Sequence, residues 1–150
     1  MPDDAVEIKI DNKLVNETLS NLAKKTDNLK PLMKNIAGIL AYATEENFKE
    51  EGRPENWVDL AEITKEKRKK IKKWPGQILQ VEGQLVTSIS TDYDNNYAVI
   101  GSNKDYARVH QLGGKAGKRK KVEIPPRPYL TLTDDNFKEI LEVAEKYFKD

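Results

Sequence analysis

The chain has 150 residues, a formal net charge of +1, a single histidine and no cysteine. This length suits one domain, and the absence of cysteine excludes disulfides and thiolate metal sites. No apolar run approaches the ~18 residues of a membrane span, and the acidic N-terminus has no signal-peptide pattern, so we expect a cytoplasmic protein without membrane contact.

The first fifty residues predict one strand and two helices. Alternating apolar and polar residues at 6–10 predict a short strand with one buried face. A helix should begin at Asp11 or Asn12 and carry an apolar side formed by Leu14, Val15, Leu19, Leu22 and Ala23. After a break at 26–30, a longer helix is predicted over 31–51. Its buried stripe comprises Leu32, Ile36, Ile39, Leu40 and Ala43.

The next segments combine loop, lysine-rich and apolar patterns. Trp57 lies in a loop and is expected to fill the core, with a binding role as the alternative. Asp59 and Glu62 fit a capping box that opens a third, mostly exposed helix. The apolar run at 78–89 is interpreted as helical on both sides of Gly83.

A hairpin and a short helix are predicted next. Segments 89–94 and 97–101 have strand patterns and are joined by two asparagines, which suit a tight turn. A helix is expected over 102–112, with Ser102 as its cap and Gly113 at its end. Tyr106, Val109 and His110 should share one face of that helix.

The last third contains a basic loop, a proline-rich arm and a helix. The loop at 115–121 leads into the arm at 124–130, whose three prolines favour an extended backbone that holds Arg127 outward. Thr133 is predicted to cap a helix with an apolar stripe of Phe137, Ile140, Leu141, Ala144, Tyr147 and Phe148. The expected fold is therefore α+β over residues 1–150, a single domain in which a long helix and several shorter helices pack on a small antiparallel sheet.

Few residues are suited to catalysis. A nucleophilic triad would have to combine His110 with Ser88, Ser90 or Ser102, and none of these serines lies in a strand-turn-helix elbow. One histidine with scattered carboxylates disfavours a zinc site, and the glycines near Lys118 lack phosphate-loop spacing. A carboxylate pair for glycoside cleavage depends on the fold and stays open. We expect a protein that is not an enzyme and uses no cofactor or metal.

Two segments concentrate positive charge. Seven of the ten residues at 64–73 are Lys or Arg against one Glu, and 115–121 adds five with no acid. The favoured interpretation is a solvated face. The alternative is a small protein that binds DNA nonspecifically through Lys65–Lys73 and Lys115–Lys121, with strong dependence on salt.

Several motifs follow one another along about two-thirds of the chain. They are F-x-x-E-G-R-P-x-x-W at 48–57, Leu60, Thr64 with Arg68, I-L-Q-x-x-G-x-L-x-x-S-I at 78–89, Y-A-x-x-H-Q-x-G-G at 106–114 and I-P-x-R-P-Y-L at 124–130. In this order they resemble the phage virion morphogenesis family, the tail completion proteins of Mu-like phages and prophages. The resemblance implies a structural protein, without enzymatic activity, that finishes the tail and helps to join it to the DNA-filled head.

The resemblance also implies partners and a contact surface. The expected partners are phage tail-tube and head-neck proteins, further copies of this chain in a ring, and DNA contacted nonspecifically at the neck. The expected location is the tail or neck of the virion, with host cytoplasm during assembly. The residues expected at interfaces are Arg53, Trp57, Tyr106, His110, Gly113, Gly114, Lys118, Arg119, Arg127, Pro128 and Tyr129. For Arg127, pairing with an acid inside the fold is an equal alternative.

Overall fold

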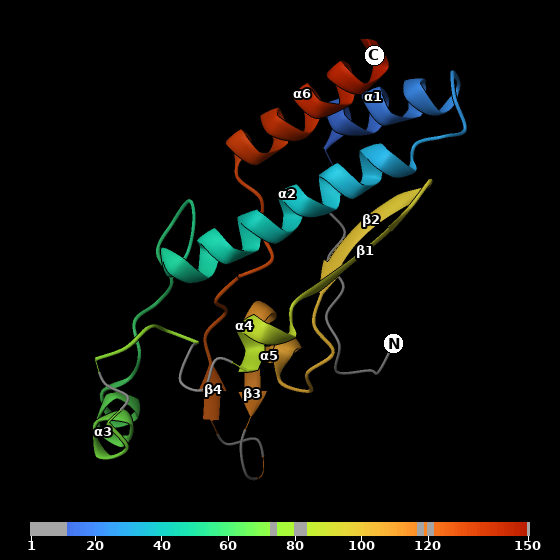
Figure 1. Ribbon diagram of the computed structural model, residues 1–150. Helices are drawn as coiled ribbons and strands as arrows, with labels where there is room; N and C mark the ends of the chain where they lie inside the picture. The colour runs from blue at the N-terminus through green and yellow to red at the C-terminus, as the bar shows by residue number, and fades with distance from the viewer. Residues whose placement is uncertain (1–11, 73–74, 80–83, 117–118, 120–121, 150) are drawn as a thin grey trace.

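The computed structural model describes residues 12–72, 75–79, 84–116, 119 and 122–149 (Figure 1). The strand predicted at 6–10 therefore lies outside the described residues. In chain order, the elements are α1 (Lys13–Ala23), α2 (Lys30–Lys49), α3 (Glu62–Lys70), α4 (Gln84–Ser88), β1 (Ser90–Asp94), β2 (Tyr97–Gly101), α5 (Ala107–Leu112), β3 (Gly114–Ala116), β4 (Val122–Ile124) and α6 (Asp134–Lys149). The α+β class is confirmed, and the described strands form two antiparallel pairs, β1-β2 and β3-β4.

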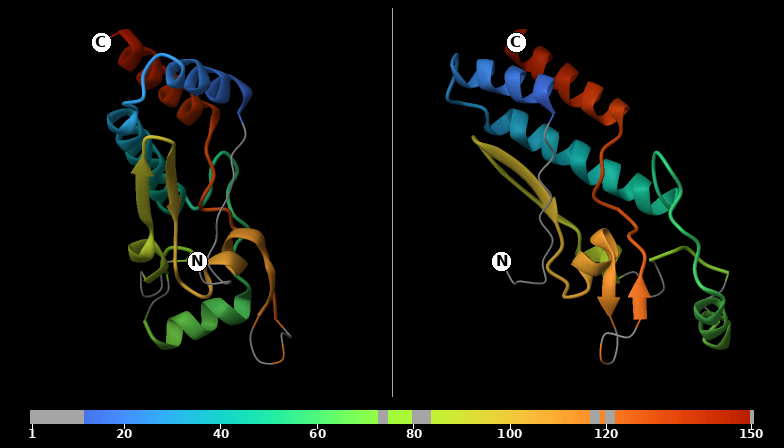
Figure 2. Two further views of the ribbon diagram at one scale, coloured as in Figure 1. Left: turned by 90° about the vertical axis from the view of Figure 1, so that its right-hand side faces the viewer. Right: turned by 180° about the vertical axis from the view of Figure 1, so that it is seen from behind.

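The long helix α2 is the centre of the fold. α6 packs on α2 with α1 at its side, and the β1-β2 hairpin packs along α2 from another direction. The turned views of Figure 2 show the same layers. The predicted apolar stripe is buried as expected, at Leu32, Ile36, Ile39, Leu40 and Ala43. Burial of one leucine or isoleucine contributes roughly 1.5–3 kcal/mol, so this stripe holds several elements together at once.

The turn of the hairpin caps the start of α2. The helix has no side-chain cap of its own at Leu29, and the Oδ1 atom of Asn95 accepts the Lys30 N–H at 2.9 Å. The predicted two-asparagine turn is confirmed, because Asp94 pairs with Tyr97 across it. The turn thus closes the hairpin and also satisfies one of the free N–H groups that every helix start exposes.

The start of α1 is also confirmed, but its apolar face is narrower than predicted. The Oδ1 atom of Asn12 accepts the Val15 N–H at 3.0 Å, as an N-cap should. Leu22 is buried, whereas Leu14 and Ala23 are exposed, which corrects the predicted stripe. α1 packs chiefly along α6. Successive residues of a helix are turned by about 100°, so Leu14 and Ala23, each next to a residue that packs inward, face solvent.

The C-terminal helix α6 begins as predicted. The Thr133 Oγ1 atom accepts the Asn136 N–H at 3.3 Å. Most of the predicted stripe is buried or partly buried, but Phe148 is 51% exposed, which corrects that position. The Lys25 ammonium lies over the Phe148 ring, 3.9 Å from its centroid, so a cation covers part of this aromatic surface.

The exposed helix α3 begins without the predicted capping box. Its N-cap is Ala61, and no side chain caps it. The Oδ1 atom of Asp59 instead accepts the N–H of the adjacent Leu60 at 2.7 Å, and its Oδ2 atom pairs with Lys65 at 2.8 Å. The lysine hydrogen bond, followed by that of the Leu60 N–H, lowers the pKa of Asp59. The Asp59 carboxylate therefore lies in the loop before α3 and binds a lysine of the helix without capping it.

Within the described part of the apolar run at 78–89, the segment after Gly83 is helical and the first two residues are not. α4 confirms the part after Gly83, whereas Ile78 and Leu79 form a turn in which Leu79 has φ +65°, so that part of the prediction is wrong. Residues 80–83 lie outside the described residues. The Ile78 N–H donates to the Oε2 atom of Glu51 at 3.0 Å, a distant partner that periodicity cannot reveal.

The segment after the first hairpin needs two corrections. α5 is shorter than the predicted helix, because the Ser102 hydroxyl shares a 2.6 Å hydrogen bond with the Ser88 hydroxyl and does not cap it. Gly113, with φ +74°, ends α5 as predicted. The first two residues of the segment predicted as a plain basic loop at 115–121 belong to β3, and β4 begins directly after that segment. Strands of three residues are too short to give an alternation signal.

Candidate functional site

A cluster of polar and aromatic side chains collects residues from three of the sequence motifs and one residue of α2. It comprises Asn47, Arg53, Trp57, Gln111, Arg127 and Tyr129, and we call it the junction. Asn47 is fully buried near the end of α2. Its amide nitrogen donates to the carbonyls of Tyr129 at 2.8 Å and Thr131 at 2.9 Å. These bonds fix α2 to the segment that leads into α6.

Arg53 connects α2 to the start of α6. Its Nε atom donates to the Oδ1 atom of Asn47 at 2.9 Å, and its Nη2 atom donates to the Ala43 carbonyl at 2.9 Å. A longer contact of 3.5 Å joins Nη2 to the side-chain oxygen of Asn136 at the start of α6. The guanidinium thus points inward and serves the fold with several of its five donors.

The two aromatic rings of the junction pack against the ring of Phe48. Phe48 stacks on Tyr129, with centroids 5.2 Å apart, and meets Trp57 edge-on at 5.8 Å. The Trp57 Nε1–H donates to the Pro128 carbonyl at 2.9 Å, so the predicted core role of Trp57 is confirmed. The Tyr129 hydroxyl donates to the Ala107 carbonyl at 2.6 Å, and burial raises the pKa of Tyr129. This phenol therefore stays protonated and acts as a structural donor.

The proline-rich arm is fixed to the rest of the fold by hydrogen bonds. Arg127 is only 6% exposed, and its Nε and Nη2 atoms donate to the carbonyls of Val58 at 2.9 Å and Asp59 at 3.1 Å. The Oε1 atom of Gln111 accepts the N–H groups of Tyr129 at 3.0 Å and Leu130 at 2.9 Å. The prediction that Arg127 is held outward is wrong, because two loop carbonyls turn its side chain inward.

His110 lies on α5, next to the proline-rich arm. Its carbonyl accepts the Arg127 N–H at 2.8 Å, and its ring lies 6.0 Å from that of Tyr106, nearly perpendicular to it. Burial, and then the positive charge of Arg127, lowers the pKa of His110. The imidazole is therefore neutral at pH 7. Its buried Nδ1 atom has no hydrogen-bond partner within the described chain.

The structure separates the eleven predicted interface residues into groups. Those that are buried are Trp57, Arg127 and Tyr129. Those that are partly buried are Arg53, Tyr106, His110 and Gly113. Those that are exposed are Gly114, Arg119 and Pro128, and Lys118 lies outside the described residues. All of the described ones except Arg119 belong to the junction, to the arm, or to α5 and β3 next to them. Most of these residues therefore contribute to packing inside the chain.

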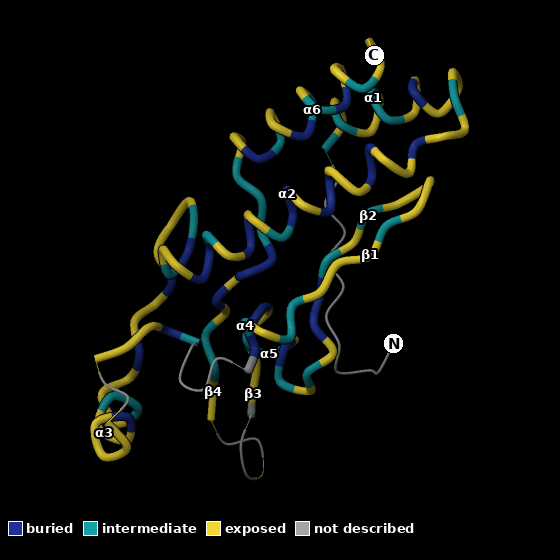
Figure 3. The backbone as a smooth tube through the Cα atoms, viewed as in Figure 1, coloured by how far each residue is buried: buried dark blue, intermediate teal, exposed yellow. Residues whose placement is uncertain are grey.

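The lysine-rich helix α3 is exposed as predicted, and it carries an exposed isoleucine that the list of interface residues did not include. α3 stands apart from the other helices (Figure 1), and Figure 3 shows most of it as exposed. Ile63 is 63% exposed, and Lys67 and Lys70 follow it on the same helical face. The signal in the sequence was the isolated isoleucine among lysines, which periodicity alone assigns to neither core nor surface.

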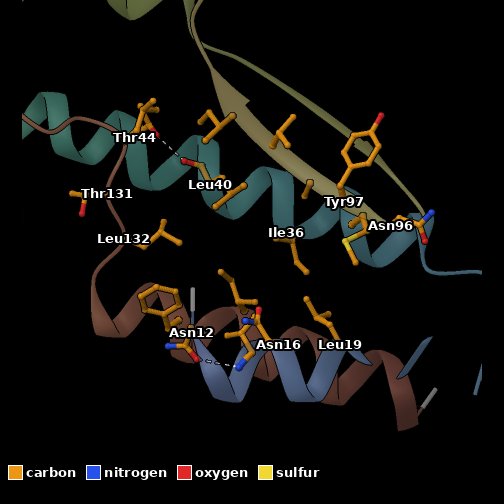
Figure 4. Close-up of a pocket in the computed structure, with 18 residues that line it drawn as sticks. Asn12, Asn16, Leu19, Ile36, Leu40, Thr44, Asn96, Tyr97, Thr131 and Leu132 are labelled. Atoms are coloured by element: carbon orange, nitrogen blue, oxygen red, sulfur yellow. Dashed lines mark hydrogen bonds between the residues drawn. The ribbon is translucent and has the colours of Figure 1, made fainter. Parts of the chain in front are cut away.

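An apolar groove lies between two layers of the fold. It has a volume of about 640 Å³ and is lined by α2 and β2 on one side and by α1 and α6 on the other. Figure 4 shows Ile36 and Leu40 from α2 facing Leu19 of α1 across it. Among the described residues, its lining contains no acid, no lysine, no arginine and no histidine. The groove therefore offers mainly apolar contact, and Tyr97 is the one titratable side chain among the described residues that line it.

The residues considered for catalysis are engaged elsewhere. Ser102 is bonded to Ser88 and accepts the Lys104 N–H at 3.2 Å, and within the described chain no hydrogen bond joins either serine to His110. The part of the chain that is described has no cluster of three His, Cys, Asp or Glu residues able to hold a metal ion. It also has no helix that is both long and apolar enough to span a membrane.

Comparison with known proteins gives a consistent family relationship. Residues 10–149 match the model of the phage virion morphogenesis family. The chain is 40% identical over 145 residues to Mu-like prophage FluMu G protein 2 of Haemophilus influenzae, covering 96% of each chain. It is 30% identical over 143 residues to the putative capsid assembly protein G of Escherichia phage Mu, covering 93% of this chain and 91% of that protein. No solved structure matches it.

Proposed function

The chain belongs to the phage virion morphogenesis family, and from this premise we propose that it completes the phage tail and helps to join the tail to the head. Family membership makes it a phage assembly protein. The proposed role in tail completion and head joining is supported by the motif resemblance, which spans the segments that build the junction, α5 and the arm. We propose further that the protein works through protein contacts and has no enzymatic activity.

The junction is the observation that carries this proposal. Its two arginines and its amide side chains make hydrogen bonds almost entirely to backbone carbonyls and N–H groups of the same chain. Such an arrangement fixes the relative position of α2, α5 and α6 and leaves no activated nucleophile or base among these residues. A rigid joint of this kind suits a protein whose task is to hold a defined shape inside a larger particle.

The proposed partners are tail-tube proteins, head-neck proteins and further copies of this chain arranged in a ring. A closed ring needs two different surfaces on each copy, so that the contact repeats head to tail. The exposed helix α3 and the β3-β4 hairpin project from the same end of the molecule and are available for such contacts (Figures 1 and 2). The proposed location is the tail or neck of the virion, with assembly in the host cytoplasm.

Co-sedimentation with purified tail tubes provides a direct biochemical test. We expect the protein to pellet with tubes and to saturate at a fixed small number of copies per tube, because a terminal ring has a limited number of sites. The matched control is the same protein in the absence of tubes, which should stay in the supernatant. A monomer that ignores tubes at every concentration would contradict the proposal.

Nonspecific DNA binding is the second candidate function. Lys67, Lys69 and Lys70 are exposed on α3, and such a helix can contact phosphates. The guanidinium of Arg68, which suits phosphate recognition best, is buried and donates to the Gln77 carbonyl at 2.9 Å. A gel-shift assay at low salt discriminates between the two functions, since an absence of retardation there removes the DNA candidate.

A further inference from the structure

The outer face of α3 combines an apolar centre with positive charge. Ile63, Lys67 and Lys70 are spaced by four and three residues and therefore lie in one row along the helix. All three are exposed, and Ile63 exposes 63% of its surface. The opposite face carries Arg68, whose bond to the Gln77 carbonyl anchors α3 to the rest of the molecule. The row is thus held outward by a buried anchor on the other side.

This composition favours a protein partner over DNA. Protein interfaces place apolar side chains at their centre and charged groups at the rim, whereas a phosphate backbone offers nothing to an exposed isoleucine. Val58, in the loop before α3, is also 60% exposed and adds to the apolar surface at this end of the molecule. The partner should therefore present acidic side chains together with some apolar surface.

A surface of that kind exists on the chain itself. Asp135, Glu139 and Glu142 are exposed on α6 and have the same spacing of four and three residues, so they form an acidic row. The neighbouring helix α1 exposes Leu14 on its first turn, at 57%. Within the described residues, no ion pair engages the acids of this row or the two lysines of the α3 row. Both rows are therefore available to an external partner.

The two rows lie at opposite ends of the molecule. α6 lies at the top and α3 at the bottom in Figure 1, and both views of Figure 2 agree. One copy therefore cannot bring its own rows together, whereas two copies can do so head to tail. A contact between two different surfaces leaves one free row at each end of the pair, so that further copies can be added until a ring closes.

We infer that the α3 row of one copy docks on the α6 row of the next copy. The inference rests on the proposed ring and names the surfaces that build it. Lysines of one copy would meet carboxylates of its neighbour, with Ile63 at the centre of the contact. Such complementarity fixes the orientation of the partner and makes association sensitive to salt.

Charge reversal on each row tests this inference by native mass spectrometry and sedimentation velocity. The first variant is Lys67→Glu with Lys70→Glu, and the second is Glu139→Lys with Glu142→Lys. Each should weaken self-association at least about tenfold, because like charges then face each other. Lys34→Glu with Lys49→Glu on exposed positions of α2 changes the net charge as the first variant does and should leave association unchanged. Circular dichroism of every variant checks that the fold is intact.

Mixing the variants gives the sharper readout. An equimolar mixture contains two compatible contacts, because α3 of the second variant matches α6 of the first and the two reversed rows match each other. Neither variant should assemble alone, whereas the mixture should form assemblies in which the two variants alternate. A chain that carries all four reversals has complementary rows again and should recover wild-type assembly. The inference is overturned if either variant alone assembles like the wild type, if the mixture associates no better than the separate variants, or if the wild type is monomeric at every concentration. In each case, co-sedimentation with tail tubes reports separately on the proposed function.

Discussion

Asn47→Ala is expected to lower the free energy of unfolding by about 3–5 kcal/mol, because each buried polar group left without a partner costs roughly 1–3 kcal/mol. The substitution removes the donor for the carbonyls of Tyr129 and Thr131 and the acceptor for the Nε atom of Arg53. Water cannot replace these bonds readily, since Asn47 is fully buried. Urea unfolding followed by circular dichroism measures the difference.

Asn35→Ala supplies the matched control for this prediction. It makes the same chemical change on the same helix, but Asn35 is exposed on α2. We expect its unfolding midpoint to stay the same or to rise slightly, because alanine favours a helix more than asparagine does. Equal midpoints for Asn47→Ala and the wild type would show that the junction does not hold the fold together.

Gly52→Ala is expected to cost at least about 3 kcal/mol, because it combines backbone strain with a steric clash. Gly52 has φ +111°, a conformation that residues with a side chain rarely adopt. A Cβ atom there would lie 2.6 Å from the Glu55 carbonyl oxygen and 2.6 Å from the Trp57 nitrogen, both of them backbone atoms. The loop that carries Arg53 and Trp57 would have to move, so we also expect loss of the near-ultraviolet circular dichroism of the tryptophans.

Gly38→Ala is expected to raise the free energy of unfolding, whereas Gly52→Ala lowers it. Gly38 lies within α2, and no atom outside its own helix backbone lies within 4 Å of the position that its Cβ would occupy. Replacing a glycine by alanine in a helix interior stabilises it by roughly 0.5–1 kcal/mol. Both glycines are therefore tested with one substitution and one assay. A stable Gly52→Ala protein would contradict the geometry described for the loop.

Much of the architecture was predictable because long periodic patterns are strong signals. α2 and α6 have apolar stripes of more than three turns, and the predicted buried positions of α2 are buried in the structure. The β1-β2 hairpin was predictable because its two asparagines suit a tight turn. The family resemblance was carried by motifs in a fixed order, and it is confirmed by the match over residues 10–149.

The missed features depend on contacts between distant residues. Arg127 turns inward because the carbonyls of Val58 and Asp59, almost 70 positions earlier, lie within reach of its guanidinium. The start of α5 is displaced because Ser102 bonds to Ser88 from another element. No local pattern contains this information, so a sequence predicts the rigid backbone of the arm but not the direction of its side chains.

The candidate site was also predictable only in part. The motifs identified residues that belong together, since Arg53, Trp57 and Tyr129 meet at the junction. Their pattern did not distinguish a buried joint from an exposed interface, because tryptophan is common in both and an arginine occurs in both once its donors are satisfied. The rows on α3 and α6 became visible only when exposure and position in the fold were known.

Electron microscopy of particles made by the phage without this protein tests the central claim most directly. If the chain is a structural piece that completes the tail, lysates should contain filled heads and separate tails, or tails of uncontrolled length, and the intact gene supplied in trans should restore joined particles. Normal, infectious virions in its absence would contradict the account.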